Sequence, residues 1–125
     1  MKAALLIALG GALGSVARWL LSGWVQDLTP SSTFPWGTFA VNAVGSFAIG
    51  ALLSLAFERA LVPPNARLFL VTGVLGGFTT FSALSYETLQ LLRDGQWPAA
   101  LGYSLGSLVV GVVAAFVGFA AAARL

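Results

Sequence analysis

The sequence predicts an all-α membrane protein with four transmembrane helices. Hydrophobic residues make up 58% of the 125 residues and the mean hydropathy is +0.94. Charged residues make up 8%, against roughly 25% in a soluble domain. Residues 28–57, 68–86 and 95–123 carry no charge, and residues 3–26 are interrupted only by Arg18. Because about 20 apolar residues cross a bilayer, four spans fit and little of the chain lies outside them.

The first half of the chain holds two predicted spans. Span one covers residues 3–25, and Gly10 and Gly14 have the spacing that lets a neighbouring helix backbone come close. Residues 27–35 contain Pro30 between hydroxyl residues, which is typical of a loop. Span two covers residues 36–57 and begins at Trp36, a residue type that anchors helix ends at the membrane interface.

The second half holds the other two spans. A polar connection over residues 58–67 contains Pro63 and Pro64, and span three covers residues 68–92. Asp94-Gly95 predicts a tight turn, after which span four covers residues 97–123. We therefore expect one transmembrane domain over residues 1–125.

The amino terminus also imitates a secretory signal peptide, because Lys2 precedes an apolar stretch and residues 15–17 (SVA) look like a cleavage site. Cleavage would leave three spans. We expect span one to be retained, because Gly10, Gly11 and Gly14 are better explained as a helix-packing face.

The distribution of Lys and Arg predicts the orientation. Four basic residues lie on the side that bears both termini, against one or two on the other side: Lys2, Arg59, Arg67 and Arg124 against Arg93 and Arg18. Because basic residues favour the cytoplasmic side, we expect both termini inside. The small difference also permits insertion in either orientation.

Several classes of function are not expected. The chain has no Cys and no His, which removes thiolate redox chemistry, haem or zinc ligation and the commonest general base. We therefore expect no enzyme. The net charge of +2 is spread over loops and helix ends, so nucleic acid is not an expected partner.

Span three contains Gly73, Gly76 and Gly77 within five residues. Glycine in a helix interior costs about 1 kcal/mol relative to alanine, so the cluster predicts a helix broken near residues 73–77. Such a break is tolerated in a membrane only where it is buried in protein or lines a watery cavity. Its free carbonyls suit a cation and its free N–H groups suit an anion. Alternatively, the glycines only allow close helix crossing.

Aromatic and hydroxyl side chains follow these glycines. Phe78 and Phe81 have the spacing of one helical face. The hydroxyl residues beside them are Thr79, Thr80, Ser82 and Ser85. Because ring edges carry partial positive charge and hydroxyls donate hydrogen bonds, this group is suited to flanking a small anion. Alternatively, the rings form a packing pair and the hydroxyls bond to their own helix.

Polar stripes mark two other spans at intervals of four residues: Asn42, Ser46 and Gly50 in span two, and Tyr103, Ser107 and Gly111 in span four. An amide in hydrocarbon needs a hydrogen-bond partner. Asn42 either donates to an anion or bonds to a neighbouring helix. Together with span three, the stripes form a candidate polar track. Arg18 is expected to attract anions at a vestibule, to pair with Glu87, or to extend to the interface.

These motifs resemble the Fluc/CrcB family of small fluoride channels. The resemblance is carried by residues 10–18 (GGALGSVAR), 37–47 (GTFAVNAVGSF) and 76–82 (GGFTTFS), in the family's order and on the same helices. It covers essentially the whole chain.

The resemblance implies a four-helix subunit in an antiparallel, dual-topology dimer with two anion pores and a central sodium ion. It implies a pore lined by Asn42, Phe78, Thr79, Thr80, Phe81, Ser82, Tyr103 and Ser107. It also implies that Arg18 ends the first-helix motif and that backbone carbonyls of Gly73 and Gly76 bind the sodium ion.

The function implied is passive export of fluoride across the bacterial inner membrane, which lowers fluoride toxicity in the cytoplasm. The partner is a second copy or a paralogue of opposite orientation. Two positions depart from the family's pattern: Trp19 replaces a frequent tyrosine, and Ala83-Leu84 replaces a frequent Thr-Phe pair. The second departure removes a possible donor hydroxyl from the polar track.

Two other functions fit four short spans. A small proton-coupled multidrug transporter needs a carboxylate within the membrane, but span one has none. The three acids nearest the spans lie close to predicted span ends: Glu58, Glu87 and Asp94. A non-transporting assembly subunit would use the glycines only for packing and would tolerate a polar residue at Phe78.

Overall fold

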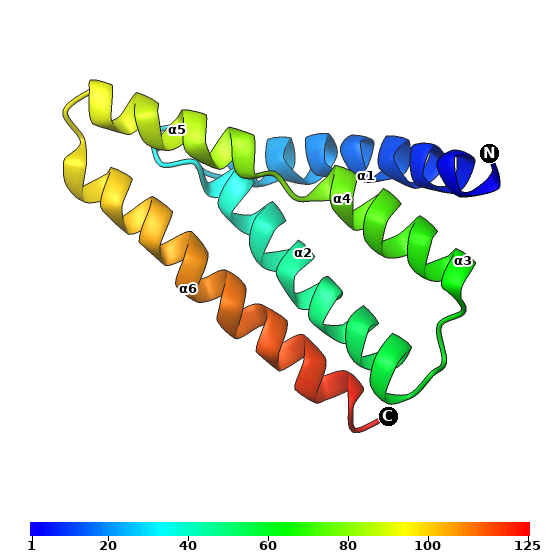
Figure 1. Ribbon diagram of the computed structural model, residues 1–125. Coiled ribbons are helices and arrows are strands. Elements are labelled where there is room, and N and C mark those ends of the chain that lie inside the picture. Colours follow the sequence, from blue (N-terminus) through cyan, green and yellow to red (C-terminus); the bar gives the residue numbers. More distant parts are fainter.

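The computed structural model describes residues 1–125, and the chain is entirely helical (Figure 1). Its elements are α1 (Lys2–Asp27), α2 (Trp36–Leu53), the π-helix η1 (Ser54–Glu58), α3 (Pro64–Arg67), the π-helix η2 (Leu68–Leu75), α4 (Gly76–Phe78), α5 (Phe81–Arg93) and α6 (Trp97–Ala122). They form four segments long and apolar enough to cross a membrane: Lys2–Asp27, Trp36–Glu58, Pro64–Arg93 and Trp97–Ala122. The four predicted helices are therefore present.

Proline and glycine account for several helix ends. The third span begins at Pro64, four residues earlier than predicted, because proline fits the first helical turn, where its missing N–H has no partner to lose. Gly95, with φ of 72°, adopts the left-handed backbone of the turn between α5 and α6.

The helices pack through glycines. A Cβ atom on Gly10 of α1 would lie 2.9 Å from the Cα atom of Gly73, and one on Gly77 would lie 3.0 Å from the Cα atom of Gly11. Both distances are too short for a side chain, so α1 and the third span approach backbone to backbone. The alternative explanation of Gly73 and Gly77, close helix crossing, therefore applies to these two glycines.

The third span is broken, but the predicted position near residues 73–77 is wrong by two residues. Gly73, Gly76 and Gly77 are helical, and the interruption lies at Thr79 and Thr80, between α4 and α5. Their backbones are extended, with φ, ψ of −80°, 155° and −149°, 120°. Helix propensity therefore located the region of the break but not the two residues that leave the helix.

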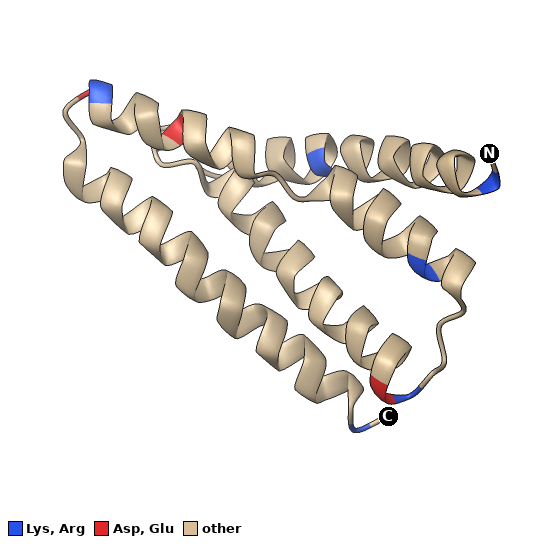
Figure 2. Ribbon diagram, in the orientation of Figure 1, with Lys and Arg blue, Asp and Glu red and all other residues tan.

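Most of the chain faces outward. Only 16 of the 125 residues are buried, and α1 and α6 expose many large apolar side chains. A chain with this surface requires lipid or another protein chain around it, and it is a multi-pass membrane protein. Figure 2 shows the charged residues near the helix ends and connections, apart from one basic residue within α1 and one acidic residue within α5.

Candidate functional site

Asn42 of α2 holds the break in the third span. Its Oδ1 atom accepts the N–H of Thr80 at 2.9 Å, and its Nδ2 atom donates to the carbonyl of Thr80 at 3.1 Å. The Thr80 hydroxyl accepts the N–H of Ala83 at 3.2 Å and so caps the start of α5. Three backbone groups at the break, the N–H and carbonyl of Thr80 and the N–H of Ala83, thus find partners within the protein, which lipid could not supply.

The pairing with Asn42 leaves one carbonyl without its helical donor. In a continuous helix, the N–H of Thr80 would bond to the carbonyl of Gly76, but it donates to Asn42 instead. Gly76 is also exposed. The carbonyl of Gly73, by contrast, accepts the N–H of Gly76 within the helix.

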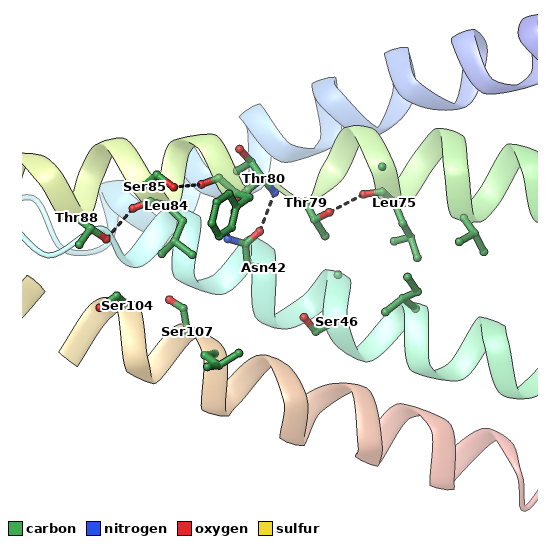
Figure 3. Close-up of a pocket in the computed structure, with 16 residues that line it drawn as sticks. Asn42, Ser46, Leu75, Thr79, Thr80, Leu84, Ser85, Thr88, Ser104 and Ser107 are labelled. Atoms are coloured by element: carbon green, nitrogen blue, oxygen red, sulfur yellow. Dashed lines mark hydrogen bonds between the residues drawn. The ribbon is translucent and has the colours of Figure 1, made fainter. Parts of the chain in front are cut away.

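A groove of about 740 Å³ runs beside the break, between α2, the third span and α6 (Figure 3). Its lining residues are Asn42, Gly45, Ser46, Ile49, Val71, Leu75, Gly76, Thr79, Thr80, Phe81, Leu84, Ser85, Thr88, Ser104, Ser107 and Leu108. Of the predicted pore residues, the groove brings together Asn42, Thr79, Thr80, Phe81 and Ser107. Donors from three helices therefore surround one space.

Most hydroxyls in the groove are already committed to helix carbonyls. Thr79 donates to Leu75, Ser85 to Phe81, Thr88 to Leu84 and Ser104 to Ala100, at 2.7–3.0 Å. The buried hydroxyl of Ser107 has no partner. The second N–H of the Asn42 amide is likewise not used. A small anion in the groove would find available donors in these two side chains and in Ser46, which lines the groove and makes no side-chain hydrogen bond.

The two phenylalanines do not share a helical face, contrary to the prediction. Phe78 ends α4 and is 9% exposed, whereas Phe81 begins α5 and is 80% exposed. The break between them turns the two rings to different environments. Phe81 lines the groove and Phe78 does not.

Tyr103 was predicted to join Ser107 on the polar track, but it does not line the groove. It is fully buried, and its hydroxyl donates to Glu87 Oε2 at 2.5 Å. The Thr38 hydroxyl donates to Glu87 Oε1 at 2.8 Å. Ser104, the next residue, lines the groove in place of Tyr103.

Arg18 lies in a second hollow of about 550 Å³ on the other side of the break. All but two of its lining residues are polar or charged: Ser15, Arg18, Trp19, Ser22, Thr38, Thr80, Ser82, Ala83 and Glu87. Ser82 therefore faces this hollow and not the groove. Arg18 and Glu87 line the same hollow, but no ion pair joins them, and a vestibule role for Arg18 stays a prediction.

Sequence reasoning did not assign Thr38, Glu87 or Ser104 to the site. Ser104 precedes Ser107 by three residues, which is a helical spacing that could have identified it. Glu87 is the one carboxylate between the break and Arg93. An ionisable residue within a span is a candidate functional residue. No sequence signal pairs Thr38 with Glu87, because 49 residues separate them.

Comparisons with known proteins match this chain to one family and to relatives that share one name. The family described as "CrcB-like protein, Camphor Resistance (CrcB)" matches residues 5–119. A protein of Thermus thermophilus named "Fluoride-specific ion channel FluC" is 57% identical over 115 residues, 92% of this chain and 89% of that protein. Proteins of the same name from Opitutus terrae and Agrobacterium fabrum are 55% and 50% identical, over 100% and 92% of this chain and 96% and 91% of theirs.

Proposed function

This chain belongs to the CrcB family, and we propose on that basis that it is a fluoride-specific ion channel that lets fluoride leave the cytoplasm passively. Relatives that match nearly the whole chain carry the name of such a channel. An ion channel is not an enzyme class. The same names support a channel and not a proton-coupled multidrug transporter.

The observation that carries the proposal is the meeting of donors beside the break. The unpartnered hydroxyl of Ser107 and the unused N–H of Asn42 face one groove. Fluoride is the smallest halide and accepts strong hydrogen bonds, so closely spaced neutral donors are able to replace its water. A larger halide would fit poorly between donors spaced for fluoride and would accept weaker hydrogen bonds from them, so these bonds would not compensate for its lost water.

Conduction requires that no single site holds the ion too firmly. Neutral donors satisfy this requirement, because a hydroxyl or amide binds an anion less strongly than a guanidinium does. Arg18, in the hollow across the break, would raise the local anion concentration without entering the groove. Phe81 would present its ring edge to the ion.

The assembly we propose is an antiparallel dimer of opposite orientations in the bacterial inner membrane. The open groove and the 80% exposure of Phe81 support a second chain, since both lie uncovered in one subunit. The small difference in basic residues between the two sides supports dual topology. A second copy or a paralogue would complete the pore.

For the sodium ion that we propose at the dimer centre, one of the two expected ligands, the carbonyl of Gly76, is well suited to bind it. The carbonyl of Gly76 has lost its helical donor to Asn42 and is exposed, so it is available to a cation. The carbonyl of Gly73 remains bonded within the helix, but its second lone pair is still able to bind. Bound sodium would supply positive charge between the two broken helices.

Vesicles test the proposal directly. Purified protein is reconstituted into liposomes loaded with fluoride or with chloride. Ion-selective electrodes then record efflux after an ionophore dissipates the membrane potential that opposes it. Fluoride should leave rapidly and chloride should stay. Equal loss of both ions, or loss of neither, would reject the proposal.

A further inference from the structure

The side chain of Gln26 makes three hydrogen bonds at the connection between α1 and α2. Its Oε1 atom accepts the N–H of Gly37 at 3.2 Å, and its Nε2 atom donates to the carbonyls of Ser32 and Phe34 at 3.4 Å. The N–H of Gly37 lies in the first turn of α2, where helix donors have no partner within the helix. Gln26 therefore ties the end of α1 to both the connection and the start of α2.

Two routes lead from these contacts to the carboxylate of Glu87. Thr38 follows Gly37 directly and donates to Glu87 Oε1 at 2.8 Å. The ring of Phe34 packs edge to face on the ring of Tyr103, with centroids 5.4 Å apart, and Tyr103 donates to Glu87 Oε2. Thr38 thus follows a residue whose backbone Gln26 bonds, and the Tyr103 ring packs on the side chain of another such residue, Phe34.

The Glu87 carboxylate stands beside the proposed path of the anion. It shares the Arg18 hollow with Thr80, and Thr80 also lines the groove. Hydrogen bonds weaken steeply when distance or angle changes. A shift of Phe34 or of the first turn of α2 would therefore change where this negative charge lies.

We propose that Gln26 is a positioning residue for the channel, which sets the Thr38 and Tyr103 hydroxyls on Glu87 through the α1–α2 connection. The inference rests on the proposed function, because it concerns the path that fluoride takes. A second contact strengthens the same connection: the Thr33 hydroxyl donates to Gln96 Oε1 at 2.9 Å, at the start of α6. Gln26 itself does not line the groove.

The test is a double-mutant cycle between Gln26→Ala and Tyr103→Phe, with fluoride efflux from liposomes as the first readout. Gln26→Ala should slow efflux about tenfold, because it removes all three hydrogen bonds of the Gln26 side chain, and one such bond alone is worth up to about tenfold. In the Tyr103→Phe background the same change should cost about threefold, because one of the two bonds that Gln26 supports is already gone while the bond from Thr38 to Glu87 remains. Gln90→Ala is the matched control, since its amide donates only to the exposed Tyr86 hydroxyl.

The second readout does not use fluoride. The unfolding midpoint in detergent should fall in Gln26→Ala and fall less in the Tyr103→Phe background. If the wild-type protein passes no fluoride, the proposed function fails while this cycle still tests the positioning role. Gln26→Glu, which keeps an acceptor for Gly37, replaces Gln26→Ala if the latter does not fold. If the losses caused by Gln26→Ala and Tyr103→Phe simply add in both efflux and the unfolding midpoint, the inference is wrong. It is also wrong if Gln90→Ala has the same effect as Gln26→Ala.

Discussion

The side-chain amide of Asn42 pairs with the backbone of Thr80 through two hydrogen bonds, of 2.9 Å and 3.1 Å. One atom of the amide accepts and the other donates, so it satisfies both backbone groups of a residue that has left the helix. An ionised Asp has the same shape but no donor, and Ser has only one polar atom for the two bonds. The broken helix and the polar residue of α2 are therefore one structural feature.

Asn42→Asp should abolish the donor to Thr80 and place a carboxylate against its carbonyl. We expect fluoride efflux to fall at least about tenfold, because a carboxylate also repels the anion and one charged contact is worth more than a neutral hydrogen bond. Efflux from liposomes measures the effect. Asn65→Asp, at the exposed start of α3, is the control and should keep normal efflux. Normal efflux in Asn42→Asp would show that Asn42 does not face the path.

Phe81→Ile should slow fluoride efflux more than about tenfold while the protein still folds. Isoleucine fills similar space but lacks the positive ring edge. Phe116→Ile is a matched control, because Phe116 is 70% exposed on α6, far from the break in sequence. If both variants conduct equally well, the ring of Phe81 has no part in conduction.

Ser107→Ala should reduce fluoride efflux severalfold without loss of stability. Its buried hydroxyl has no partner, so removing it takes away a polar group that is unsatisfied in the folded state. Ser104→Ala removes a hydroxyl already bonded to Ala100 and should change efflux less than about twofold. The paired measurements are efflux and the unfolding midpoint in detergent. A destabilised Ser107→Ala variant with normal efflux would contradict the prediction.

Gly10→Ala should destabilise the fold by about 1–3 kcal/mol, the usual cost of forcing extra atoms into a packed contact. The added Cβ would lie 2.9 Å from the Cα atom of Gly73. Gly23→Ala adds the same atom to the same helix with nothing within 4 Å. It should be neutral or slightly stabilising, because alanine favours helices. Unfolding in detergent compares the two, and equal stability would exclude close packing at Gly10.

Arg18→Gln should lower fluoride efflux severalfold at low ionic strength, and the difference from wild type should shrink as an impermeant salt is added. Charge in an open hollow acts through a field that salt screens over about 10 Å at 0.1 M. Arg18→Lys keeps the charge and should recover most of the rate. A loss that is independent of salt would indicate a structural role for Arg18.

Local features of the sequence predicted the four spans and the polar stripes. Length and apolarity decide whether a segment crosses a bilayer, and both are read directly along the chain. The glycine cluster located the break to within two residues. Helical spacing also identified Asn42 and Ser107, which do meet at the groove.

The tertiary structure decided which residues leave the helix and which side chains reach the groove. Thr79 and Thr80 break the third span because Asn42, 38 residues away from Thr80, bonds to its backbone. Tyr103 bonds to Glu87, whereas Ser104 lines the groove. The packing of α6 on α2 sets the rotation of α6 and so decides which of the two residues faces the groove. Propensity and spacing act within a few residues, whereas hydrogen bonds and glycine contacts between helices depend on chain segments that only the folded arrangement brings together.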